Sequence, residues 1–135
     1  MEVKLKLDTD KYRFFIFENR TWQIFLEIQT KEILYWDKLL QTALKKDGDR
    51  IVNNDENNAA DLYHKELLKQ KSEMEKLNHD IWQQQEQLDK DCKLNIHYDI
   101  DTYRIQDILR ARAKVIEISF IELKYNFMIY FSNVY

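Results

Sequence analysis

The sequence predicts an all-α protein, an antiparallel bundle of three long helices with coiled-coil-like packing. The 135 residues contain one glycine and no proline, so the chain lacks the residues that the many turns of a β sandwich or barrel use. Apolar side chains also recur at alternating intervals of three and four residues over long stretches, the repeat of a helix that packs along one face. At this length we expect a single domain over residues 1–135.

The first helix is expected over residues 10–47, after a short strand or arm at 1–9 in which apolar and charged residues alternate. Two lysines followed by Gly48 suit a helix C-terminus. The apolar seam of this helix consists of Trp22, Leu26, Gln29, Ile33, Trp36, Leu40 and Ala43. The residues expected to widen its buried face are Phe25, Ile28, Tyr35 and Leu39.

The asparagine-rich stretch 49–58 is predicted to be the main loop. A second helix is expected over residues 59–92, with Asn58 as its N-terminal cap. Its seam consists of Tyr63, Leu67, Gln70, Met74, Leu77, Ile81, Gln84 and Leu88. Two of these positions are Gln and most of the remaining surface is polar or charged, so this helix should pack along a narrow stripe.

A third helix is expected over residues 103–131, after a break in the pattern near His97. Its last third is apolar on nearly all sides, and a helix of that kind is enclosed by partners in its own chain or another. Residues 127–134 are aromatic and β-branched, so a strand is an alternative that periodicity alone does not decide. The apolar residues of this helix are Ile105, Ile108, Leu109, Val115, Ile116, Phe120, Leu123 and Phe127.

Aromatic residues form 13% of the chain and gather towards its two ends. The simpler interpretation is a core between the first and third helices, and the alternative is a face that binds a partner or a second subunit. The candidate interface residues are Trp22, Trp36, Ile116, Phe120, Phe127 and Phe131. We therefore expect a homo-oligomer or a complex with a helical partner protein.

No catalytic, cofactor-binding or metal-binding residues are predicted, so an enzyme is not expected. His64 and His79 lie about 22 Å apart on one helix, too far to share a metal ion. Cys92 is the single cysteine and is expected to be a buried thiol near a helix end. The net charge of -3 gives no basic excess of the kind that nucleic-acid-binding proteins carry.

The chain contains no predicted signal peptide or membrane span. The apolar run from Phe14 to Phe17 is too short for either, and the uncharged residues 125–135 fall short of the roughly 20 that a spanning helix needs. As written, the chain is expected in the cytoplasm.

The C-terminal part resembles the TolC-type outer membrane efflux family. The resemblance is carried by a stretch that begins His97-Tyr98-Asp99-Ile100-Asp101-Thr102 and ends at Leu109, and by the later runs Phe120-Ile121-Glu122 and Lys124-Tyr125-Asn126-Phe127. Members of that family repeat a tyrosine and an acidic residue before a bend, followed by a helix that closes on a similar aromatic run. The similarity is close over residues 97–135 and is limited to helical pattern before them.

The resemblance implies a tunnel-wall module, in which antiparallel helices stack with other subunits around a lumen for export. It also implies a place in the cell envelope, and membrane association is expected only in this case. Asp101 stands where the family usually has a glycine, and family members are longer, with a secretory signal and barrel strands. The alternative function is a small soluble helical bundle that serves as an interaction or scaffold protein, with no catalysis.

Overall fold

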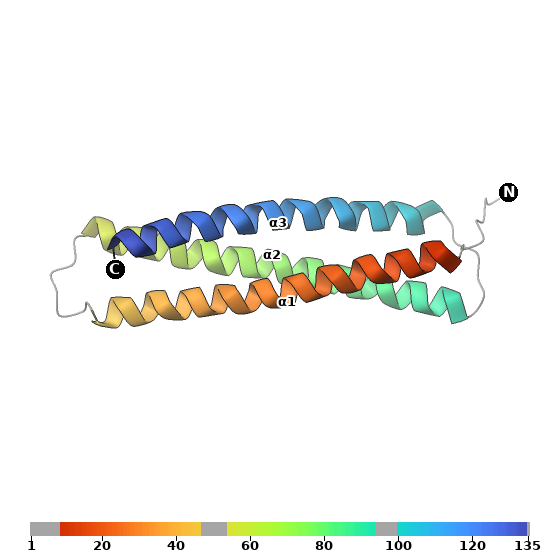
Figure 1. The fold of residues 1–135 in the computed structure, drawn as a ribbon, viewed down its shortest axis with the longest axis horizontal. Helices are drawn as coiled ribbons and strands as arrows, with labels where there is room; N and C mark the ends of the chain where they lie inside the picture. Colours follow the sequence, from red (N-terminus) through yellow and green to blue (C-terminus); the bar gives the residue numbers. More distant parts are fainter. Residues whose placement is uncertain (1–8, 47–53, 94–99, 135) are drawn as a thin grey trace. The chain divides into compact units, whose positions relative to one another are not determined.

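The computed structural model describes residues 9–46, 54–93 and 100–134, all of which are helical. The helices are α1 (Thr9–Lys46), α2 (Asn54–Lys93) and α3 (Ile100–Val134), coloured in chain order in Figure 1. The prediction of an all-α bundle of three helices is confirmed. The predicted N-terminal strand or arm lies outside the described residues except for Thr9, and the predicted cap Gly48 also lies outside them.

Helices α2 and α3 begin several residues earlier than predicted, whereas α1 begins within one residue of its predicted start. α2 begins at Asn54 instead of residue 59, so Asn58 lies inside the helix and the predicted loop is shorter. The sequence Asn54-Asp55-Glu56 explains the earlier start, because asparagine suits a helix cap and acidic residues suit the first turn. α3 begins at Ile100 and continues to Val134. The strand alternative for residues 127–134 is therefore wrong.

The chain divides into two compact units, and every helix contributes to both. The first unit comprises residues 1–26 and 75–115, and the second comprises residues 27–74 and 116–135. Within the first unit, Tyr12 of α1 bonds Asp89 of α2, whereas the later α1 residue Asn19 bonds the earlier α2 residue Gln85. The two helices are therefore antiparallel there. We describe each unit separately.

The first unit has a core with one polar layer. Phe15 and Leu88 are buried and pack with the partly buried rings of Tyr12 and Tyr103. The rings of Phe15 and Tyr103 pack edge to face, with their centroids 5.6 Å apart. This is a favourable aromatic geometry. The other buried residues of this unit are Asn19, Leu26, Leu77, Ile81, Gln84, Asp91, Gln106 and Leu109.

The second unit has an aliphatic and aromatic core. Its buried residues are Ile33, Trp36, Leu40, Ala60, Leu67, Met74, Phe120 and Phe127. The amide of Gln70 on α2 donates a hydrogen bond to the backbone carbonyl of Ile116 on α3, at 3.3 Å. A polar side chain predicted for the seam of α2 therefore has an acceptor on the neighbouring helix.

The seams predicted for α1 and α2 are confirmed, because all their residues are buried or half-buried. The predicted widening of the α1 face is wrong for Phe25, Ile28 and Tyr35, which are exposed. Of the apolar residues named for α3, Ile105, Ile108 and Val115 are exposed, whereas Gln106 is fully buried. The buried positions of α3 follow the three-and-four repeat that begins at Gln106, a polar residue whose hydrogen bonds permit its burial.

Candidate functional site

An aromatic cluster links all three helices in the second unit. The indole of Trp36 on α1 stacks on Phe120 and Phe127 of α3, with ring centroids 5.5 and 5.9 Å apart. Tyr63 of α2 meets Phe127 edge to face at 5.8 Å and stacks on Tyr130 at 4.5 Å. These rings fill the space between α1 and α3 inside the unit, as the simpler interpretation of the aromatic residues predicted.

The six predicted interface residues occupy three different environments. Trp36, Phe120 and Phe127 are buried in the second unit, and buried side chains offer little surface to a partner, so we place these three in the core. Phe131 and Ile116 are half-buried in the same unit, whereas Trp22 is half-buried in the first unit. The assignment of Trp22, Ile116 and Phe131 to an interface stays a prediction.

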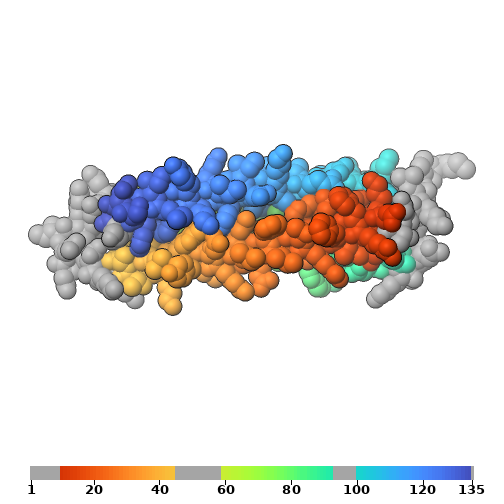
Figure 2. Space-filling view, viewed as in Figure 1, coloured from red at the N-terminus to blue at the C-terminus, as the bar shows by residue number. Residues whose placement is uncertain are grey.

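The exposed apolar surface lies mainly on α1 and α3. Among the described residues, seven large apolar side chains are exposed on α1 and nine on α3, against three on α2. The face of the molecule seen in Figure 2 consists mostly of side chains from α1, in red to yellow, and α3, in blue. Sequence reasoning placed most of these side chains in a core or did not single them out. On α1 they are Phe14, Phe17, Ile24, Phe25, Ile28, Leu34 and Tyr35.

In the second unit these side chains form two stripes, each with its own helical repeat. We define the α1 outer stripe as Ile28, Lys31 and Tyr35, spaced by three and four residues. The α3 outer stripe comprises Ile118, Glu122, Tyr125 and Ile129, spaced by four, three and four residues. Residues at this spacing share one helix face, opposite the seam that packs in the core. The first unit repeats the pattern with Phe14, Phe17, Ile24, Ile108 and Val115.

The outward face of α2 is polar at the equivalent positions. These positions begin at Leu62, which is the single large apolar residue of the row and is exposed. The others are Lys65, Lys69, Ser72, Lys76, His79, Gln83, Glu86 and Lys90, all exposed. The three helices thus share one kind of inner seam but differ in their outward surfaces: among the residues described, α2 exposes only Leu62, Leu68 and Trp82 as large apolar side chains, fewer than α1 or α3.

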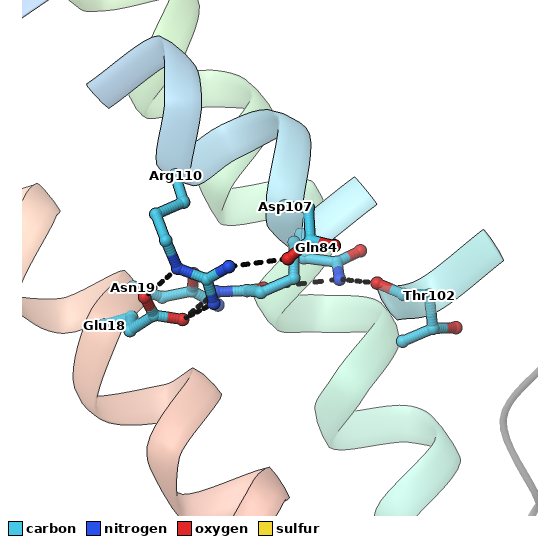
Figure 3. A network of polar contacts seen from close by, with 7 residues as sticks. Glu18, Asn19, Gln84, Thr102, Asp107 and Arg110 are labelled. Carbon is cyan, nitrogen blue, oxygen red and sulfur yellow. Dashed lines mark hydrogen bonds and ion pairs between the residues drawn. The ribbon is translucent and has the colours of Figure 1, made fainter. Parts of the chain in front are cut away.

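A polar layer crosses the core of the first unit, with one buried amide side chain from each helix. Asn19 and Gln106 are fully buried and Gln84 is 5% exposed. Gln106 Nε2 donates to Asn19 Oδ1 at 2.9 Å. Gln84 Nε2 donates to Gln106 Oε1 at 3.4 Å and to the backbone carbonyl of Thr102 at 3.1 Å. Figure 3 labels Asn19 of α1, Gln84 of α2 and Thr102 of α3 in this network, with Thr102 beside Gln84.

An ion pair adjoins this layer. Arg110 Nε and Nη2 donate to the two carboxylate oxygens of Glu18, each at 2.6 Å, and Nη1 donates to Asp107 at the same distance. Figure 3 shows the guanidinium between the two carboxylates. Hydrogen bonding to Glu18 raises the pKa of Arg110 above its usual value, although burial acts in the opposite direction. The guanidinium also lies over the ring of Phe14, 6.0 Å from the ring centroid.

The layer continues towards α2 through Gln85. Asn19 Nδ2 donates to Gln85 Oε1 at 2.9 Å, and Gln85 Nε2 donates to Asp89 at 3.0 Å. The hydroxyl of Tyr12 also donates to Asp89, at 2.7 Å. Burial, followed by this hydrogen bond, raises the pKa of Tyr12 well above its usual value. In the described part of the chain every buried side-chain nitrogen and oxygen has a partner, so the network is fully satisfied and suits a structural role that fixes helix register.

The reactive side chains His64, His79 and Cys92 occupy different environments. His64 Nδ1 lies 2.5 Å from Asp37 Oδ1 and 3.3 Å from the amide of Gln41, an arrangement that joins α2 to α1 in the second unit. His79 is exposed, and the predicted burial of Cys92 is wrong because its thiol is exposed on α2, close to the helix end. Nowhere in the described ranges do three His, Cys, Asp or Glu side chains come together as metal ligands.

A groove of about 490 Å³ lies between α2 and α3 in the second unit. Two carboxylates, Glu66 and Glu122, line it together with apolar and amide side chains. The complete lining is Ala59, Leu62, Tyr63, Glu66, Gln70, Ser119, Glu122, Leu123 and Asn126. Glu122 therefore belongs both to this groove and to the α3 outer stripe.

Across residues 9–46, 54–93 and 100–134, no helix contains a run apolar enough to cross a membrane. Comparison with known proteins found no matching protein-family model, no matching curated protein and no matching solved structure.

Proposed function

We propose that this chain is a non-catalytic helical interaction or scaffold module that binds other helices through the outward faces of α1 and α3. The distribution of exposed large apolar side chains carries this proposal: they concentrate on α1 and α3, whereas the equivalent face of α2 is polar. A helix with a polar outward face can leave that face in water while its inner seam packs in the bundle. A helix that is apolar on two faces is typically enclosed by further helices.

The energetics indicate what kind of partner is needed. Complete burial of one such side chain contributes about 1.5–3 kcal/mol. The apolar residues of the outer stripes are already about half covered, so each would add about 1 kcal/mol. Association costs about 4–15 kcal/mol in lost freedom. The free energy gained by burying one stripe against a polar surface is smaller than that cost. The partner must therefore contribute an apolar face of its own.

A second proposal is the tunnel-wall module that the efflux-family resemblance implies. Apolar outward faces on both α1 and α3 favour it, because helices of a tunnel wall pack against neighbours on either side. In that case the chain belongs to the cell envelope. A gene neighbourhood that encodes a membrane-fusion protein and an inner-membrane pump would favour the tunnel.

The test of the interaction module compares the wild-type chain with a variant that carries Ile118→Gln, Tyr125→Gln and Ile129→Gln. These side chains are exposed, so helix content and thermal stability should change little. We expect the wild type to associate or, as a monomer, to bind a hydrophobic dye, and we expect the variant to lose that behaviour. Gln83→Ala on the outward face of α2 is the control and should leave both properties intact. A wild-type monomer that binds no dye would contradict the proposal.

A further inference from the structure

We infer that the partner of the α1 outer stripe is the α3 outer stripe of a second copy of this chain. The inference rests on the proposed function, because it names the helical partner that the interaction module binds. It concerns the second unit, where both stripes are exposed. Three observations carry it: the spacing of the stripe residues, the charges within the stripes and the open surroundings of Glu122.

The spacing of the exposed residues indicates a helical occupant. Ile28 and Tyr35 on α1 are 50% and 61% exposed, and they are one heptad apart. Ile118 and Tyr125 on α3 are 49% and 66% exposed and are also one heptad apart. Two helices that carry the same repeat can interlock along their length, with the side chains of one entering the spaces between those of the other. The chain itself thus supplies two faces whose exposed residues have the same spacing.

The charges select which face meets which. Each outer stripe contains one charged residue, Lys31 on α1 and Glu122 on α3. Contact between an α1 stripe and an α3 stripe brings opposite charges together. Contact between two α1 stripes would oppose two lysines, and contact between two α3 stripes would oppose two glutamates. Like charges at a contact disfavour the wrong pairing, so the mixed contact is favoured.

Both charged side chains are available for such a contact. Lys31 pairs with Glu27 one turn away, but the two side chains are 74% and 68% exposed, and a pair of that kind contributes little. Glu122 is exposed on α3. The Glu122 side chain borders the open groove between α2 and α3. A lysine side chain from a second copy can approach it there.

This contact joins two different surfaces. Where two copies make it reciprocally, α1 to α3 and α3 to α1, both stripes of each chain are used and a symmetric dimer closes. Where a pair makes the contact only once, successive copies add in the same sense, and the assembly closes as a ring or continues as a filament, according to the rotation between copies. A symmetric dimer built on a single stripe would instead stop at two copies.

Charge exchange tests the contact directly. Four forms of the full chain are compared by sedimentation equilibrium: wild type, Lys31→Glu, Glu122→Lys and the double variant. Each single change opposes like charges and should weaken association about tenfold or more. The double variant should restore it, and so should an equimolar mixture of the two single variants, because every contact then joins opposite charges again. Lys69→Glu and Glu86→Lys on the outward face of α2 are the controls and should have no effect.

The outcomes separate this inference from the proposed function. Single variants that associate like the wild type, or a double variant that is not restored, would overturn the mixed contact. A wild-type monomer that binds a hydrophobic dye would overturn the second copy as partner but leave the interaction module standing. A wild-type monomer that binds no dye would overturn both. Far-ultraviolet circular dichroism and thermal unfolding confirm that each variant is folded.

Discussion

Arg110 on α3 and Glu18 on α1 form a two-pronged ion pair in the first unit, with both nitrogen–oxygen distances at 2.6 Å. The Glu18 side chain is 11% exposed and that of Arg110 is 41% exposed. The planar guanidinium can donate two parallel hydrogen bonds to the carboxylate only when Arg110 and Glu18 lie opposite each other on the two helices. The pair therefore helps to set the register between helices that are not consecutive in the chain.

Substitution of Arg110 by Lys should destabilise the first unit even though the charge is kept, because an ammonium group cannot donate two parallel hydrogen bonds to Glu18. We expect the free energy of unfolding to fall by about 1–3 kcal/mol, measured by chemical denaturation. Arg104→Lys is the control, since the pair of Arg104 with Asp101 is 66% and 61% exposed and should contribute less than about 1 kcal/mol. Equal effects at both arginines would contradict the structural role of Arg110.

The buried amide layer should behave non-additively. Gln106→Leu removes the donor to Asn19 Oδ1 and one of the two acceptors of Gln84 Nε2, so it should reduce the free energy of unfolding by about 1–3 kcal/mol. Replacement of all three amides by Leu removes the unsatisfied groups and should be less destabilising than that single change. We expect the triple variant instead to lose the specific register between its helices, and sedimentation should then show a mixture of association states. Additive losses in the single and triple variants would contradict a coupled layer.

The inner seam of α2 should dominate stability. Ile81 is fully buried, and Ile81→Ala should reduce the free energy of unfolding by about 2–5 kcal/mol, as large-to-small changes in cores do. Gln83→Ala is the matched control, because Gln83 is exposed on the same helix and should change stability by less than about 0.5 kcal/mol. Gln85 would be a poor control, since its amide bonds Asn19 and Asp89. Similar effects of Ile81→Ala and Gln83→Ala would exclude the seam.

Stability should decline in alkaline solution partly through Tyr12. Its pKa is raised by burial and by the hydrogen bond to Asp89, so the folded state keeps the phenol protonated at a pH where the unfolded state loses the proton. This contribution is fully present below the usual tyrosine pKa of about 10 and is lost as the pH rises above it. The Tyr12→Phe variant should show a shallower fall in unfolding free energy above that pH. An unchanged slope would contradict the assignment.

The sequence predicted most of the fold because the inner seams are local patterns. The heptads of α1 and α2 identify buried residues such as Ile33 and Leu67 without any knowledge of what they contact. The chain could not reveal in the same way that Gln106 is buried. An amide at a core position is stable only when specific partners satisfy it, and its partners Asn19 and Gln84 come from two other helices.

The outward faces were misjudged for a different reason. Apolar residues on two sides of one helix look, in a single sequence, like one broad buried face. Tyr35 was therefore assigned to the core beside Trp36, whereas the structure buries Trp36 and exposes Tyr35. A count of two separate repeats on α1 and α3, against one on α2, would have revealed both outward faces. The structure distinguishes the repeat of the inner seam from that of the outward face, because only the first is buried in the folded unit.

The most direct measurement is the mass of the wild-type chain by sedimentation equilibrium across the micromolar range, with hydrophobic dye binding measured on the same samples. If the outward faces of α1 and α3 bind helices, the mass should rise with concentration above that of one chain, and dye binding should fall as association increases. A mass equal to one chain at every concentration, together with no dye binding, would contradict the account.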